Sequence, residues 1–251
     1  MRIGRELLCL FLTALPCVAQ AATLRGVLPV AGSVHGAFGS SFKTSLQLNN
    51  RTDVPQSGVL VFHPAGQSAA DTDPRLTYAL GPHQTVSYDD VVDAMGTSGL
   101  GSIDVLVDVG AVPAIVARAF DDEGTLGTTG AGIRAVSPEA AAKSGATTTL
   151  VAPGDLDRFR FNIGVRSLEG GATLKATIYA SSGSVRNIVD GLVFPASYFV
   201  QRPAAEFLGG LTLAPNDSIE FEVVSGAAIL YGTTTDNTTN DPAIQLAQEA
   251  N

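Results

Sequence analysis

The chain has 251 residues and a formal net charge of −9, with 15 lysines and arginines against 24 aspartates and glutamates. Binding to nucleic acids and to anionic membranes relies on clustered Lys and Arg, so this charge balance argues against both partners. Tryptophan is absent and 27 residues are glycine, a composition that favours short strands and turns over long helices.

Residues 1–21 have the pattern of a secretory signal peptide. Arg2 and Arg5 precede the apolar run "LLCLFLTALPCVA", which ends at the small-residue pattern Ala19-Gln20-Ala21. The run is too short to span a bilayer comfortably. We therefore expect a secreted, periplasmic or cell-surface protein that is not inserted in the membrane after the signal is removed.

The two cysteines, Cys9 and Cys17, both lie within this signal segment. The mature chain would then have no disulfide, no thiol nucleophile and no cysteine-based metal site. Removal of the segment also takes away more positive than negative charge, so the mature chain would be slightly more acidic than the full one.

Short apolar runs separated by Gly, Pro, Asn and Asp predict strands in the first half of the chain, near 24–31, 42–49, 58–63, 75–88, 102–108 and 113–120. The stretch "SYDDVVDAMG" predicts one or two helical turns. There Ser87 and Asp90 have the spacing of a capping box, and Gly96 stands at the helix exit.

The second half of the chain repeats this pattern. "FKTSLQLNN" (Phe42–Asn50) has the same alternation as "FRFNIGVRS" (Phe159–Ser167), and "VLVFHPAG" has the same design as "ATIYASSG" at the same offset. The predicted helix has a counterpart in "RPAAEFLGG", and "AIVARAFDD" (Ala114–Asp122) aligns with "AILYGTTTD" (Ala228–Asp236). Four elements in one order predict an internal duplication.

The duplication predicts two tandem domains after the signal peptide. We expect a domain over 22–134, a linker over 135–148 and a second domain over 149–251. The C-terminal "PAIQLAQEAN" fits either a short strand or a frayed tail. Because long helices do not alternate with the strands, the fold class is all-β, as two antiparallel Ig-like β-sandwiches.

Within "FRFNIGVRS", the apolar positions are the ones that both copies retain, and they predict the buried face of a strand. Arg160 and Arg166 alternate with them. We therefore expect both arginines to face solvent, where ion pairs with surface carboxylates contribute about 0–1 kcal/mol each.

The stretches "GAFGSSFKTSLQLNN", "VFHPAG", "GLGSIDV" and "DNTTNDP" resemble an uncharacterised group of exported bacterial proteins that carry tandem β-sandwich modules. The resemblance spans most of both copies. It implies a fold and an exported location, and it transfers no activity and no functional residue. The second copy departs from the pattern, because it has no "GLGS" before its "IEFE" strand.

Catalysis has little support in the sequence. The histidines are His35, His63 and His83, all in the first copy and all in settings that predict ordinary surface loops. The sequence has no "GxSxG" motif of the kind that carries a serine nucleophile. The Asp residues at the start of the predicted helix need no catalytic explanation, because acidic side chains stabilise the positive end of the helix dipole. We expect no enzyme, no catalytic residue and no bound organic cofactor.

Calcium remains as a metal hypothesis. "FDDEG" and "TDNTTND" follow the last strong strand of each copy, and they supply Asp121, Asp122, Asp236 and Asp241 as candidate ligands. The spacing fits no EF-hand, and Asp and Asn are also the usual residues of turns, so turn chemistry is the competing explanation.

The leading functional hypothesis is an exported, non-catalytic protein with a structural role or a protein- or ligand-binding role at the cell surface or in the envelope. If it binds something, the two Asp-rich loops and the cleft between the domains are the first places to look. A two-domain periplasmic assembly chaperone is an alternative, although the acidic charge is against it. A secreted hydrolase is a weaker alternative.

Overall fold

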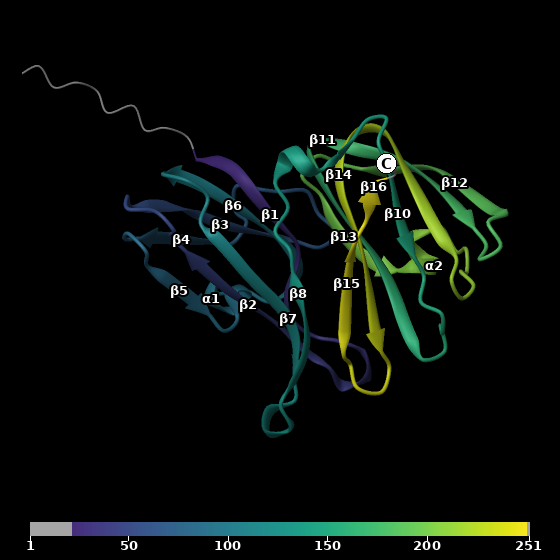
Figure 1. Ribbon diagram of the computed structural model, residues 1–251, viewed down its shortest axis with the longest axis horizontal. Coiled ribbons are helices and arrows are strands. Elements are labelled where there is room, and N and C mark those ends of the chain that lie inside the picture. Colours follow the sequence, from purple (N-terminus) through teal and green to yellow (C-terminus); the bar gives the residue numbers. More distant parts are fainter. Residues whose placement is uncertain (1–21, 250–251) are drawn as a thin grey trace, which may run out of the picture.

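The computed structural model describes residues 22–249, which form two antiparallel sheets of eight strands each. The predicted all-β fold of two β-sandwiches is confirmed (Figure 1). The predicted signal peptide, residues 1–21, lies outside the described residues. None of the helices within residues 22–249 is long and apolar enough to cross a membrane.

The first sandwich is built from the strands of the first sheet, which are β1 (Thr23–His35), β2 (Ser41–Asn49), β3 (Gln56–Pro64), β4 (Arg75–Leu80), β5 (Thr85–Tyr88), β6 (Gly99–Val109), β7 (Ala114–Asp122) and β8 (Thr128–Ile133). One layer has the order β4-β3-β6-β1 and the other has β2 flanked by β5 and β7, with β8 beyond β7. The end of β1 joins the layers by pairing with β2 at Val34 and Phe42.

The second sandwich contains β9 (Ala142–Lys143), β10 (Thr147–Val151), β11 (Phe159–Tyr179), β12 (Val185–Phe194), β13 (Phe199–Pro203), β14 (Ser218–Asp236), β15 (Pro242–Leu246) and β16 (Gln248–Glu249). The strands β9 and β10 begin inside the predicted linker and pair with β14. The C-terminal segment forms β15, so the strand alternative for this segment is confirmed.

The short helices are α1 (Val91–Ala94), α2 (Ala204–Phe207) and the 3-10 turns η1 (Ala37–Gly39), η2 (Gly124–Leu126) and η3 (Pro138–Ala140). The helix α1 lies where the sequence predicts it. Its N-cap is Asp90, whose carboxylate accepts from the amides of Val92 and Asp93, so the capping residue is not Ser87.

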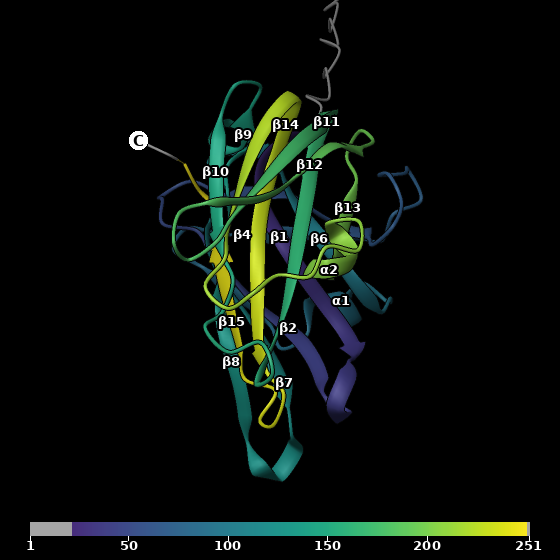
Figure 2. The same ribbon diagram turned by 90° about the vertical axis from the view of Figure 1, so that its right-hand side faces the viewer.

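Two long strands, β11 and β14, form the centre of the second sandwich and lie side by side (Figure 2). Each runs through both layers and bends where the pairing shifts, near Gly171 and Gly226. These glycines have φ of +70° and +76°, and a Cβ on Gly226 would lie 2.0 Å from the Gly171 carbonyl oxygen. The corner therefore requires glycine for its backbone angles and for the close approach of the two strands.

The same strand order recurs in both sandwiches, as an internal duplication predicts. The strand β11 occupies the place of β2 and β3 joined end to end, and β14 occupies the place of β6 and β7. Phe42 pairs with Asp121 in the first sandwich, and Phe159 pairs with Asp236 in the second.

This register corrects the sequence alignment of the last repeated pair by one residue. Asp121, and not Asp122, is equivalent to Asp236, and Ile115 is equivalent to Leu230 because these residues face Leu48 and Val165. The sequence alignment is wrong because it matches the letters "AI" that occur in both copies. The error matters because a shift of one residue exchanges the two faces of a strand.

The apolar core of the second sandwich includes Ile163, Val165, Leu174 and Phe221, which are all fully buried. Phe199 and Tyr231 also come from the second sandwich, but they belong to the apolar cluster of the first. The two sandwiches are therefore packed against one another through continuous apolar contacts.

Candidate functional site: the cleft between the sandwiches

The face of β11 that carries Arg160, Asn162, Gly164 and Arg166 lies toward the first sandwich. Its other face packs in the core of the second sandwich, as the alternation predicts. The prediction that both arginines face solvent is wrong. Arg166 is 1% exposed and is the largest fully buried side chain in residues 22–249, and Arg160 is half-buried. The sequence pattern identifies the polar face correctly, but this face meets a second domain.

Arg166 belongs to a buried group of charges that we call the interface network, formed by His63, Asp73, Asp104 and Arg166. Arg166 Nη2 lies 2.8 Å from Asp104 Oδ2, and His63 Nδ1 lies 2.6 Å from Asp73 Oδ2. His63 Nε2 lies 3.0 Å from Asp104 Oδ2, outside hydrogen-bond geometry. Asp104 and His63 lie on β6 and β3, so the network joins the two sandwiches.

The location of His63 corrects a second prediction. The sequence places this residue where a strand passes into a turn, and it does lie at the end of β3, but the expectation that it is a surface histidine is wrong because it is 5% exposed. Its strand partner Ser102 is fully buried, and the Ser102 hydroxyl has no hydrogen-bond partner. Ser102, His63 and Asp73 are therefore all buried, and no hydrogen bond joins Ser102 to His63.

Several atoms of the interface network have no hydrogen bond, namely Asp104 Oδ1, Arg166 Nε and His63 Nε2. Asp104 is the carboxylate that contacts the guanidinium of Arg166, whereas Asp73 contacts His63. Buried ionised groups are costly unless they are paired and hydrogen-bonded. The ion pair of Arg166 and Asp104 is therefore weak evidence for stabilisation of the contact, although removal of one partner would leave the other buried without a counter-charge.

Tyr231 lies between the interface network and the open part of the same face. Its ring covers Gly164, where a Cβ would lie 2.0 Å from the ring, and its hydroxyl donates to Gln201 Oε1 at 2.9 Å. Burial raises the pKa of Tyr231 well above its usual value. The backbone also crosses the interface, because Gly66 N donates to Phe199 O at 2.9 Å.

Beyond Tyr231 the two sandwiches separate and leave a cleft of about 1050 Å³. Figure 1 shows the two sandwiches side by side, the first in purple to teal and the second in green to yellow. Apolar side chains from both sandwiches line the cleft, among them Val34, Phe42, Leu100, Leu156, Leu213 and Ile244. Mostly apolar concave sites with few polar groups, often at domain interfaces, are typical of ligand sites.

The basic side chains lining the cleft are Lys43 and Arg160, which hold equivalent positions in the two sandwiches. Lys43 is ion-paired with Asp122 at 2.6 Å. This hydrogen bond and the Asp122 charge raise the pKa of Lys43. Arg160 donates to Asn240 Oδ1 at 2.9 Å and lies 5.3 Å from the centre of the Phe38 ring.

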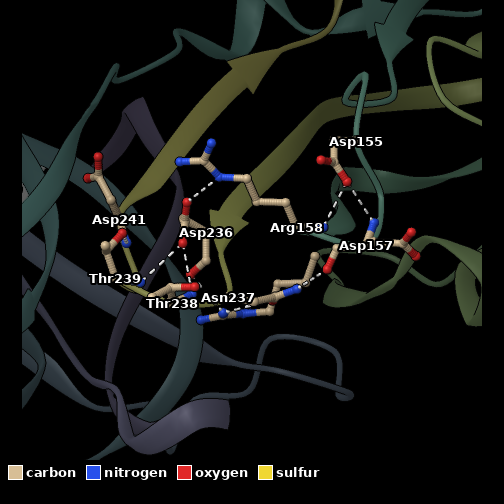
Figure 3. Close-up of polar contacts among 9 residues, drawn as sticks. Asp155, Asp157, Arg158, Asp236, Asn237, Thr238, Thr239 and Asp241 are labelled. Atoms are coloured by element: carbon tan, nitrogen blue, oxygen red, sulfur yellow. Dashed lines mark hydrogen bonds and ion pairs between the residues drawn. The ribbon is translucent and has the colours of Figure 1, made fainter.

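The four calcium candidates lie at the ends of β7 and β14 and in the loop after β14. The carboxylate of Asp121 accepts from Ser41 N, and that of Asp122 accepts from Lys43 and from Gly124 N. Asp236 accepts from Arg158 Nε at 2.9 Å and from the amides of Thr238 and Thr239 at 2.8 and 3.1 Å (Figure 3). Asp241 is exposed.

The carboxylates of Asp121, Asp122 and Asp236 therefore already accept hydrogen bonds from protein donors. Such bonds are what the competing explanation, the ordinary role of Asp in turns, predicts. Within residues 22–249, no three His, Cys, Asp or Glu side chains are grouped closely enough to hold a metal ion. The calcium hypothesis itself stays a prediction that binding experiments test.

Thermal unfolding with and without EDTA tests the calcium hypothesis. We expect an unchanged midpoint, because the carboxylates of Asp121, Asp122 and Asp236 already accept hydrogen bonds from the protein. A midpoint that falls in EDTA and recovers with added Ca²⁺ would instead support a calcium site.

The lowered pKa of Asp236 predicts that the free energy of unfolding depends on pH. The Thr238 amide, the Arg158 guanidinium and the Thr239 amide lower the pKa of this carboxyl. A folded pKa below the unfolded value of about 3.9 means that Asp236 stabilises the fold at neutral pH. This contribution is lost as the pH falls through the folded pKa.

We therefore expect Asp236→Asn to flatten the decline of unfolding free energy below about pH 4, as measured by urea unfolding at several pH values. Asp241→Asn, which changes an exposed carboxylate of the same loop, is the control and should leave the decline unchanged. Equal profiles for the native chain and Asp236→Asn would contradict the prediction.

The sequence prediction names the cleft between the domains but not the side chains that close it. The sequence does contain one signal for these side chains, which is a single charged or titratable residue within an apolar strand. The examples are His63 after Phe62, Asp104 between Ile103 and Val105, and Arg166 after Val165.

Comparison of the chain with models of protein families found no match, and comparison with curated proteins found none either.

Proposed function

We propose that this chain is an exported, non-catalytic binding protein that holds its ligand in the cleft between the two sandwiches. The observation that carries the proposal is the cleft itself, which has a volume of about 1050 Å³ and a mostly apolar lining drawn from both sandwiches. Apolar surface left accessible in this way gains free energy when a ligand removes it from water.

The histidines give no support to hydrolysis in the cleft, because none of His35, His63 and His83 belongs to its lining. His63 is buried in the interface network, away from the lining of the cleft. His83 is on the surface and pairs with Asp53 at 2.9 Å. The export signal predicted over residues 1–21 supports a role in the envelope or outside the cell.

An uncharged apolar dye, Nile red, tests the proposal. We expect its fluorescence to rise and shift to the blue on addition of the protein, with saturation at one site. Val34→Trp places a bulky side chain in the cleft and should weaken the binding of the dye, whereas Val116→Trp, on an exposed position of β7 outside the lining, should not.

The natural chain has no tryptophan, so each variant also carries a single fluorescent reporter of its own surroundings. Energy transfer from the introduced tryptophan to residual bound dye in the Val34→Trp variant, and little transfer in the Val116→Trp variant, would place the dye in the cleft. Equal binding to both variants, or no binding to the native chain, would overturn the proposal.

A further inference from the structure

Arg160 differs from the other arginines of β11 and its neighbouring loop in the partners of its guanidinium. Arg158 and Arg166 each contact a carboxylate, of Asp236 and Asp104 respectively. Within residues 22–249, no carboxylate lies within ion-pair distance of Arg160. Its contacts are the ring of Phe38 and neutral oxygens.

The neutral oxygens come from the last residue of β14 and from the loop that follows it. Arg160 Nη1 donates to Asp236 O and to Asn237 Oδ1, both at 3.3 Å, and Nη2 donates to Asn240 Oδ1 at 2.9 Å. Asn240 in turn donates to Phe38 O at 3.2 Å. These contacts hold the guanidinium at the wall of the cleft, and burial lowers the pKa of Arg160, as expected for a cation partly removed from water.

The other charged side chains that line the cleft either have partners within the protein or are exposed to solvent. Lys43 is paired with Asp122. Asp155 accepts from the amides of Asp157 and Arg158 at 3.1 and 2.9 Å, and Asp157 is exposed (Figure 3). Asp121 and Asp236 act on Arg160 only from a distance. Arg160 is therefore a half-buried cation whose charge has no direct counter-ion beside an apolar cavity.

We propose, resting on the proposed function, that the ligand of the cleft is a single-chain amphipathic carboxylate, with its carboxylate on Arg160 and its alkyl chain against the apolar lining. A carboxylate can accept two parallel hydrogen bonds from a guanidinium, and such charge-assisted bonds are stronger than bonds to neutral oxygens. The alkyl chain would cover side chains such as Val34, Phe42, Leu156 and Ile244.

Displacement of Nile red by three C12 amphiphiles, each below its micellar concentration, tests the proposal. We expect dodecanoate to bind at least about tenfold more tightly than dodecanol, and dodecylammonium to bind more weakly than dodecanol. Arg160→Met should abolish the preference for dodecanoate over dodecanol, and Arg160→Lys should keep part of it.

Arg118→Met is the matched control. Arg118 also lies over a phenylalanine ring, at 5.2 Å from the centre of Phe120, but it does not line the cleft. This variant should keep the full preference for dodecanoate. Thermal unfolding of each variant shows whether it is folded, and the dodecanol affinity shows whether its cleft is intact.

The outcomes separate this inference from the proposed function. If dodecanoate and dodecanol bind equally, or if Arg160→Met keeps the preference, the carboxylate inference fails while the cleft remains a binding site. If the native chain binds neither Nile red nor any of the amphiphiles, the proposed function fails and the inference fails with it.

Discussion

Replacing Arg166 by methionine is expected to lower the free energy of unfolding by about 3–5 kcal/mol. Arg166 is 1% exposed, and its Nη2 lies 2.8 Å from Asp104 Oδ2. Methionine retains much of the packing volume but leaves Asp104, which is 7% exposed, without the cation that compensates its charge. Urea unfolding at neutral pH measures the change.

The double variant Arg166→Met with Asp104→Leu is the control. Replacing both members of a buried ion pair by apolar side chains is often neutral or stabilising, so the double variant should recover most of the lost stability. A double variant as unstable as Arg166→Met would show that the arginine acts through its packing, and a stable Arg166→Met would contradict burial of the pair.

Gly226→Ala is expected to lower the free energy of unfolding by about 3 kcal/mol or more. Alanine at φ of +76° is strained, and its Cβ would lie 2.0 Å from the carbonyl oxygen of Gly171 in the adjacent strand. Backbone atoms of a paired strand cannot move aside as a flexible side chain can. Denaturant unfolding followed by far-ultraviolet circular dichroism measures the effect.

Gly183→Ala separates strain from collision. Gly183 has a similar φ of +85° in the same sandwich, but a Cβ there would meet nothing within 4 Å. This control should lose only about 1 kcal/mol, the part that comes from the backbone angle. Equal losses of unfolding free energy at the two positions would mean that β11 and β14 move apart at Gly226 with little energetic cost, and that the steric clash is not the cause.

The sequence predicts the strands well where alternation and turn residues agree. The predicted stretches near 42–49 and 58–63 correspond to β2 (Ser41–Asn49) and β3 (Gln56–Pro64), and the helix before Gly96 is present. The strand β8 is missed, because "TTGAGI" has small residues and no large apolar alternation. Its strand conformation comes from pairing with β7.

The cleft and the interface network are harder to predict, because they depend on the contact between two domains. Alternation in "FRFNIGVRS" separates two faces of a strand, but it does not say whether the polar face meets water or another sheet. Arg166 and Asp104 are 62 positions apart in sequence, and only the packing of the sandwiches brings them together. The sequence pattern of one repeat therefore does not predict how the two sandwiches pack against each other.

The two copies also differ in where their backbone can be lengthened. Residues 50–55 and 110–113 leave the ladder of the first sandwich, whereas the equivalent corners of the second lie within the continuous strands β11 and β14. New residues in a surface loop are tolerated better than residues that break paired strands. Insertions, tags or grafted peptides therefore belong at the exposed residues 110–111 of the first copy rather than beside Asn50, which is fully buried and donates to Val54 O and Gly81 O. In the second copy, a residue added at either corner would interrupt the pairing of β11 with β14, which runs through both layers.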